Sequence, residues 1–522
     1  MVRLRVSAQP SPTGALNDMH RTSGLLLHPT SLPSPYGVGD LGPSARRFVD
    51  FLAAAGQGLW QMLPLGPTGY RDSPYQCTSA FAANPMLISP DGLLEAGWIE
   101  ASDLDARPAF PEDQVDFGAV APWKTQLLER AWAGFAERAS EDDRAGYAQF
   151  CEREAFWLDD YVLYHALKTH HDLRPWTEWE PALAQRKRAA LTRWSKRHSA
   201  EIELQCFIQY VFHRQWSELR DYAHARGVHL IGDIPIFVAH DSSEVWTHPE
   251  WFELDADGHP TVIAGVPPDY FSATGQRWGN PLYRWPVLAA DGYRFWVERL
   301  RRMLELVDLV RIDHFRGFAG YWEIPASEET AINGRWAPGP GLALFHALTA
   351  ALGENLPLIA EDLGVITEDV ETLRDTLELP GMAVLQFGFE DLEDGFGGSS
   401  FLPHNHRRRL AVYTGTHDNN TLLGWWGERS ESMREQACVY LNSDGQAVNW
   451  DFIRVALGSV ADLALFPVQD VLNLGAEACM NRPGTAEGNW LWRYREDQLD
   501  PSAAERLLRL SRLNGRRPYE PG

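Results

Sequence analysis

Eight short, apolar, β-rich runs are the feature that most restricts how this chain of 522 residues can fold. Amphipathic helical patterns alternate with them, for example at 43–56, 295–307 and 367–377. This alternation favours a parallel α/β sheet, and eight runs favour a (β/α)8 TIM barrel over an open doubly wound sheet. The doubly wound alternative also lacks a GxGxxG after the first run. In chain order the runs are 24–32, 58–66, 228–238, 308–315, 356–364, 382–389, 410–418 and 462–472.

Two long connections interrupt the predicted barrel. The first contains Ala, Glu, Arg, Leu and Trp at helical spacing, which indicates a mainly helical insertion. The second is dense in Pro, Gly, aromatic and acidic residues, and it leaves the carboxyl end of a strand, where it would cover an active site. We therefore predict a catalytic barrel over 21–500 with insertions at 90–223 and 239–294, a disordered tail at 1–20, and a C-terminal helix and tail at 501–522.

Composition narrows the classes of partner. A formal net charge of -24 repels phosphate backbones and argues against a nucleic-acid partner. No apolar run is long enough for a transmembrane helix, and the N-terminal residues lack the apolar core of a signal peptide. The five cysteines are scattered and form no CxxC pair, which is typical of a reduced, cytoplasmic protein without a zinc site.

Acidic residues stand at the carboxyl ends of four predicted strands. They are Asp233, Asp313, Glu361 with the adjacent Asp362, and Asp418. One such residue could be a helix cap or part of a structural ion pair, but four on separate strands converge on one mouth of the barrel. Converging carboxylates suggest glycoside chemistry, in which a retaining enzyme places a nucleophile and a protonated acid about 5–5.5 Å apart.

Two basic residues lie close to these acids in the sequence. Arg311 precedes Asp313 by two positions and therefore shares its face of the strand, so it can keep Asp313 ionised or form a structural ion pair. His417 beside Asp418 could be a base, a metal ligand or a hydroxyl donor, but no second histidine has metal-like spacing and we expect no metal. The absence of GxSxG argues against a Ser-His-Asp hydrolase.

Seven stretches closely resemble the amylomaltases, a family of 4-α-glucanotransferases also called disproportionating enzymes and related to the α-amylases. The resemblance covers about residues 21–500. It implies the barrel fold, no cofactor, and retaining transfer of α-1,4-glucan segments from maltooligosaccharides or amylose to an acceptor glucan or glucose. The stretches are GLLLHPTSLPSPYGVGDLG (24–42), DSPYQCTSAFAANPMLIS (72–89), GDIPIFVAHDSSEVW (232–246), SATGQRWGNPLY (272–283), RIDHFRGF (311–318), IAEDLG (359–364) and TGTHDNNT (414–421).

The same resemblance implies roles for individual residues. Asp313 would be the nucleophile, Glu361 the general acid/base, and Asp418 the carboxylate that binds the hydroxyls of the reacting glucose. Tyr75 would stack on that glucose, while Gln276 and Trp278 would contact the acceptor from a loop covering the cleft. The matched residues expected to bind substrate are Tyr75, Asp233, Gln276, Trp278, Arg311 and His417.

One position departs from the family pattern, since Asn420 stands where many relatives carry an acid. This change affects local hydrogen bonding and leaves the three catalytic carboxylates in place. Two rival functions remain: a retaining α-glucan hydrolase with the same carboxylates, and a catalytically inactive glucan-binding protein on the same scaffold. The SPYQ and GQRWGNPLY stretches favour the transferase over the hydrolase.

Overall fold

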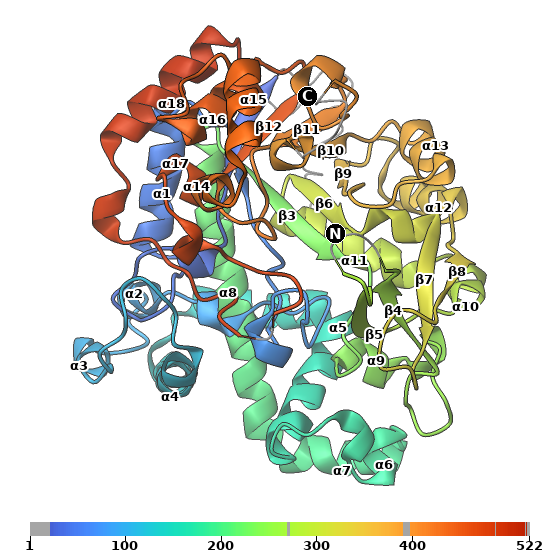
Figure 1. The fold of residues 1–522 in the computed structure, drawn as a ribbon. Helices are drawn as coiled ribbons and strands as arrows, with labels where there is room; N and C mark the ends of the chain where they lie inside the picture. The colour runs from blue at the N-terminus through green and yellow to red at the C-terminus, as the bar shows by residue number, and fades with distance from the viewer. Residues whose placement is uncertain (1–20, 269–271, 390–396, 486, 517, 519–522) are drawn as a thin grey trace, which may run out of the picture.

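The computed structural model describes residues 21–268, 272–389, 397–485, 487–516 and 518, so the tail predicted at 1–20 lies outside the described residues. Its centre is an eight-stranded sheet with the order β10-β11-β12-β1-β2-β3-β6-β9 (Figure 1). Each of the eight predicted runs supplies one strand, which confirms the (β/α)8 barrel. The strands are β1 (Thr22–Leu26), β2 (Leu59–Gln61), β3 (His229–Pro235), β6 (Leu309–Asp313), β9 (Leu358–Ala360), β10 (Gly381–Val384), β11 (Leu410–Tyr413) and β12 (Leu463–Pro467).

The barrel closes between β9 and β10, the two strands at the ends of this order. The strand pairs within the sheet are all parallel. The backbone N–H of Ala360, the last residue of β9, donates to the carbonyl of Pro380 just before β10, at 2.9 Å. Closure brings the carboxyl ends of all eight strands to one rim.

The inward faces of the strands form an apolar layer with polar residues above it. Because alternate residues of a strand share a face, Arg311 and Asp313 follow Leu309 on the inward side of β6. In the barrel interior the Tyr413 hydroxyl donates to Gln61 Oε1 at 2.9 Å. The apolar layer consists of Leu59, Ile231, Leu309, Ile359, Met382, Val384, Ala411, Tyr413, Leu463 and Leu465, all buried.

Helices surround the barrel where the amphipathic patterns predict them. The three patterns correspond to α1 (Pro43–Ala54), α11 (Arg294–Leu306) and α13 (Glu368–Thr376). Pro43 begins α1, a position where the missing N–H of proline costs no hydrogen bond within the helix. The helix buries Phe48, Val49 and Leu52. The layer also contains α12 (Leu342–Leu352), α14 (Leu422–Gly427), α15 (Glu431–Leu441), α16 (Val448–Gly458), α17 (Val468–Val471) and α18 (Pro501–Leu513).

Contacts between the first and last helices complete this layer, because α18 packs against both α1 and α16 (Figure 1). Between β10 and β11 the described residues form only the 3-10 helices η8 (Leu385–Gly388) and η9 (Pro403–Asn405). Among the described residues, no helix has both the length and the apolar character needed to cross a membrane.

The long connection between β2 and β3 is helical. Its long helix α5 begins with a capping box, in which Ser140 and Asp143 satisfy each other's backbone N–H groups. The last helix, α8, packs against α5 and also contacts α1, α11 and β3, so it lies in the helical layer of the barrel as well. The helices are α2 (Pro90–Glu95), α3 (Ala101–Asp105), α4 (Phe117–Arg138), α5 (Glu141–His170), α6 (Pro181–Ala184), α7 (Arg188–Arg197) and α8 (Ser199–His224).

A second, antiparallel sheet lies beside the barrel and was not predicted from the sequence. Its order is β5-β4-β7-β8 (Figure 1). The connection after β3 contains α9 (Ser243–Thr247), β4 (Val262–Val266), β5 (Gln276–Pro281) and α10 (Trp285–Ala290), whereas β7 (Gly320–Pro325) and β8 (Arg335–Pro338) follow β6. Pairing of β4 with β7 therefore ties the second connection to the chain that leaves Asp313.

Candidate active site

Arg311, on the inward face of β6, forms ion pairs with two of the predicted carboxylates. Its Nη1 lies 2.7 Å from Asp233 Oδ2, and its Nη2 lies 3.0 Å from Asp313 Oδ1. The parallel register of β3 and β6 places Arg311 opposite Asp233, and the two-residue period places Asp313 on the same face. Arg311 and Asp233 are buried, whereas 29% of the Asp313 side chain is exposed at the rim.

Burial and the neighbouring charges determine the pKa values within the trio of Arg311, Asp233 and Asp313. Although burial lowers the pKa of Arg311, the charges of Asp233 and Asp313 raise it well above its ordinary value, so the guanidinium stays charged. Burial, with a smaller contribution from Asp313, raises the pKa of Asp233. The trio therefore places a permanent positive charge beside the one carboxylate that reaches the rim.

Glu361 follows β9 and is held by two backbone groups. Its Oε2 accepts from the N–H of His314 at 2.7 Å, and its Oε1 accepts from the N–H of Leu363 at 2.9 Å. Burial and, more weakly, the charge of Asp313 raise the pKa of Glu361 to about 7, against the opposing effect of Arg311. This carboxyl group can therefore give up or take a proton near neutral pH.

A sharp turn after β6 connects Glu361 to Asp313. His314 has a φ of 55°, in the left-handed region that non-glycine residues seldom occupy. This conformation directs its N–H to the Glu361 side chain, and the next residue, Phe315, donates to the Glu361 carbonyl at 3.1 Å. Residues held in such conformations concentrate at functional sites.

Asp418 lies in the loop after β11, with 43% of its side chain exposed. Its Oδ1 accepts from Asn481 Nδ2 at 2.6 Å, and its Oδ2 lies 3.3 Å from His417 Nε2. Burial lowers the pKa of His417, so the imidazole contacts Asp418 mainly in its neutral form. Among the described residues, no group of three metal-binding side chains includes His417.

Tyr75 links the Asp233 side of the site to the Asp418 side. Its hydroxyl donates to Asp233 Oδ2 at 2.8 Å, and its ring stacks on His417 with centroids 5.1 Å apart. Burial and the charge of Asp233 raise the pKa of Tyr75 well above its ordinary value, so the hydroxyl remains a donor. One face of the ring is covered by His417, and Trp490 approaches it at a tilt, 5.9 Å away.

Gln276 and Trp278 reach the site from β5 of the second sheet. The Trp278 ring meets the His314 ring edge-on, with centroids 4.8 Å apart, and its Nε1 donates to Gln276 Oε1 at 3.1 Å. The structure thus brings the predicted residues into one connected set, from Asp418 through Tyr75, Arg311 and the turn at His314 to Gln276.

Three further residues take part in these contacts and were missed in the sequence. His314 stands within the RIDHF stretch, directly after Asp313, so its place in the motif was a usable signal. Asn481 and Trp490 lie in the connection between α17 and α18, where no motif marks them. Asn420, the position expected from the sequence to differ from the family pattern, donates to Glu428 Oε1 at 2.8 Å.

The chain is similar to known proteins over nearly its whole length. A family model described as 4-alpha-glucanotransferase matches residues 27–499. The 4-alpha-glucanotransferase of Thermus thermophilus is 52% identical over an alignment of 509 residues that covers 96% of this chain and 100% of that protein. The 4-alpha-glucanotransferase of Synechocystis sp. is 49% identical over 502 residues, 96% of this chain and 99% of that protein.

Among solved structures, an amylomaltase from Streptococcus agalactiae in complex with acarbose is similar to this chain. The two share 37% sequence identity and superimpose with a TM-score of 0.91 over 95% of this chain and 99% of that one. Both the family match and these identities extend over nearly the whole chain. The chain therefore belongs to the family of 4-α-glucanotransferases.

Proposed function

We propose that this protein transfers α-1,4-glucan segments from maltooligosaccharides or amylose to another glucan or to glucose, with retention of configuration and without a cofactor. Membership of the 4-α-glucanotransferase family supports this activity. The observation that carries the proposal is the pairing of Asp313 with Arg311 beside Glu361, whose pKa is raised to about 7. These are the two carboxyl groups that double displacement needs, one charged and one able to hold a proton.

In the first half-reaction, an Asp313 carboxylate oxygen attacks C1 of the donor glucose. The bond from C1 to the glycosidic oxygen breaks, and that oxygen takes the proton held by Glu361. The shortened glucan leaves with a new hydroxyl, and the donor segment is esterified to Asp313. Arg311, 3.0 Å from Asp313 Oδ1, supports the carboxylate before attack and again when it leaves.

In the second half-reaction, Glu361 acts as a base. It removes the proton from the 4-hydroxyl of an acceptor glucan or glucose, whose oxygen attacks C1 and displaces Asp313. Glu361 then holds a proton again, and the cycle is complete without external reactants. Two inversions at C1 give net retention.

The other polar residues of the site bind the reacting glucose. Asp418, held at Oδ1 by Asn481, would accept hydrogen bonds from its hydroxyls and bind more strongly as the ring flattens. Asp233 and Tyr75, joined at 2.8 Å, form the enclosed side of this site. Since His417 covers one face of Tyr75, only the remaining face and the ring edge are available to the sugar.

Transfer requires that the glycosyl-enzyme meets a sugar before it meets water. Gln276 and Trp278 stand on β5, next to His314 and so beside the ester that Asp313 would form. A flat indole there would hold an acceptor ring and keep water out. We assign these two residues to the acceptor side.

A cytoplasmic location is also part of the proposal. All five cysteines are free, as is typical of a reducing compartment.

The substrate class is supported by charge as well. The net charge of -24 fits a neutral glucan better than a nucleic acid.

The test is incubation of the purified protein with maltotriose and separation of the products over time. We expect glucose together with a ladder of longer maltooligosaccharides and almost no gain in reducing ends. Glucose and maltose alone, with reducing ends rising, would make the protein a hydrolase that uses the same carboxylates. Absence of turnover with maltotriose and with amylose plus glucose would contradict the proposal.

A further inference from the structure

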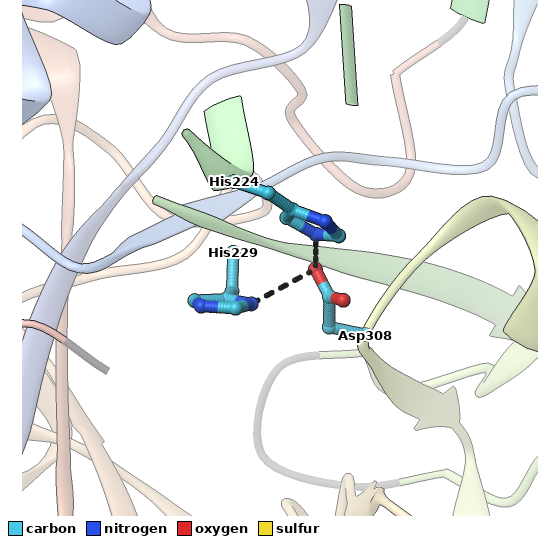
Figure 2. Close-up of side chains that lie close together, drawn as sticks. All are labelled: His224, His229 and Asp308. Carbon is cyan, nitrogen blue, oxygen red and sulfur yellow. Dashed lines mark hydrogen bonds and ion pairs between the residues drawn. The ribbon is translucent and has the colours of Figure 1, made fainter. Parts of the chain in front are cut away.

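Three side chains converge at the opposite end of the barrel from the carboxylates (Figure 2). His224 is the last residue of α8, His229 is the first of β3, and Asp308 directly precedes β6. His224 Nε2 lies 2.9 Å from Asp308 Oδ2, and His229 Nδ1 lies 3.5 Å from the same oxygen. One nitrogen of each histidine and one carboxylate oxygen all lie within 4.8 Å of one another.

Two of these separations are those of donor atoms around one small cation. With metal–ligand distances of about 2.0–2.1 Å, neighbouring donors are roughly 2.9 Å apart in octahedral geometry and roughly 3.4 Å apart in tetrahedral geometry. The two measured separations, 2.9 and 3.5 Å, match this range. An ion could replace the proton shared by His224 and Asp308 with small side-chain movements.

The donor set selects the class of cation. Two imidazole nitrogens and one carboxylate oxygen suit Zn²⁺, Co²⁺, Ni²⁺ or Cu²⁺, whereas Mg²⁺ and Ca²⁺ prefer oxygen ligands. The N–H of Leu230 donates to Asp308 Oδ2 at 2.7 Å and so fixes the carboxylate. The side chains of His224, His229 and Asp308 are 34%, 9% and 20% exposed, which leaves a path for an ion and room for a water ligand.

We propose that His224, His229 and Asp308 bind one divalent transition-metal ion of the zinc class, which stabilises the folded barrel and takes no part in glucan transfer. Five residues of extended chain, roughly 16 Å, separate Asp308 from Asp313, so the ion is remote from the reaction. The ion joins the end of α8 and the start of β3, which are close in sequence, to the start of β6, which is far from both in sequence. A ligand that binds only the folded chain stabilises it by mass action.

This proposal departs from the absence of metal expected from the sequence. That expectation rested on the spacing of cysteines and on the surroundings of His417. His229 and Asp308 are far apart in the sequence and meet only because β3 and β6 are neighbours, with the Asp308 N–H donating to the Leu230 carbonyl at 2.9 Å. The spacing of residues in the sequence does not predict the contact between His229 and Asp308.

The test uses the full chain, freed of metal with a chelator and titrated with Zn²⁺ alone in a calorimeter. We expect saturable binding of one ion per chain, and a Tm about 2 to 3 °C higher at a hundredfold excess of free Zn²⁺ over Kd. Co²⁺ should give a visible absorption band typical of nitrogen and oxygen ligands. His224→Gln and Asp308→Asn should each weaken binding at least about 100-fold and abolish the Tm shift.

A matched control separates this site from casual surface binding. His248 also lies beside a carboxylate, 3.1 Å from Glu250 Oε1, but no second imidazole of the described residues joins it, so His248→Gln should bind Zn²⁺ as the wild type does. Circular dichroism and metal-free transfer from maltotriose would show that the His224 variant is folded. No saturable binding at millimolar Zn²⁺, or equal binding in all three variants, would overturn the proposal. Transfer that is lost with the chelator and restored by Zn²⁺ would overturn the purely structural role.

Discussion

The two ends of strand β6 hold carboxyl groups in opposite electrostatic situations. At the carboxyl end, burial raises the pKa of the neighbouring Glu361 to about 7, so the group can exchange a proton at neutral pH. At the amino end, burial also acts on Asp308, but hydrogen bonds from His224 and His229 hold its pKa below the ordinary value. Burial alone therefore does not decide the charge of a carboxyl group; the donors around it do. In this barrel one rim carries an acid that can exchange a proton near neutral pH, and the other carries an acid that stays charged.

Removing a carboxylate from each end of β6 in turn is the strongest test of whether the two ends have separate roles. Asp313→Ala should reduce transfer from maltotriose by at least about 10⁴-fold, because it removes the proposed nucleophile. Its Tm should remain within a few degrees of the wild type, since 29% of this side chain is exposed. Initial rates of glucose release and a thermal melt measure both effects.

Asp308→Ala is the matched substitution at the other end. It should keep transfer within about twofold of the wild type while lowering the free energy of unfolding by about 2–3 kcal/mol, because the Leu230 N–H and two imidazoles lose their acceptor. If Asp308→Ala remained folded and lost transfer as completely as Asp313→Ala, the two rims would not have separate roles.

The rim residues could be predicted from the sequence because their pattern is local. Four acids end apolar strands, and Arg311 and Asp313 are two residues apart, so strand periodicity alone places them on one inward face. The contacts of Asn481 and Trp490 could not be predicted, because they depend on a loop whose path no motif determines.

Long-range pairing limited the prediction in the same way. The sheet β5-β4-β7-β8 joins strands on both sides of β6, so the second connection alone did not reveal it. The cluster of His224, His229 and Asp308 requires that β3 and β6 lie side by side, which follows from the strand order of the sheet and not from residue spacing. Alternating patterns predict which face a residue occupies, but not which distant residue it meets.

A second experiment tests the role of Glu361 through the pH dependence of the transfer rate. Glu361→Gln keeps the shape of the side chain but cannot donate or accept the proton, so transfer should fall about 10³-fold. In the wild type, the transfer rate should decline as pH rises through about 7, because the acid form of Glu361 is lost. This alkaline decline should disappear in the variant.

A donor with a leaving group that needs no proton, such as a maltosyl fluoride, provides the control. Glu361→Gln should form the glycosyl-enzyme from it far faster than from maltotriose, whereas Asp313→Ala should not. Equal defects with both donors in the Glu361 variant would count against its role as the acid.

A third, smaller effect concerns the acceptor side of the rim. Trp278→Ala should lower the ratio of transfer to hydrolysis about tenfold, since the indole beside His314 would no longer hold an acceptor. Trp336→Ala, on β8 of the same sheet but packed on Trp322, is the matched control and should change the ratio much less. Product analysis with and without added glucose gives both ratios, and parallel losses of transfer and hydrolysis in Trp278→Ala would exclude an acceptor role.

The smallest effect, on the order of 1 kcal/mol, tests the comparison through stability alone. The raised pKa of Glu361 means that its contribution to stability is present below its ordinary value of 4.5 and is lost as pH rises through about 7. Relative to the wild type, Glu361→Gln should therefore become more stable as pH increases from about 4.5 to 8.

The lowered pKa of Asp308 has the opposite effect on stability: its contribution is present above its ordinary value of 3.8 and is lost in stronger acid. Asp308→Asn should be less stable than the wild type at neutral pH, and the difference should begin to shrink only as pH falls below about 3.8. Urea midpoints across this range measure both differences, and slopes of the same sign would show that the two rims do not differ as the contacts indicate.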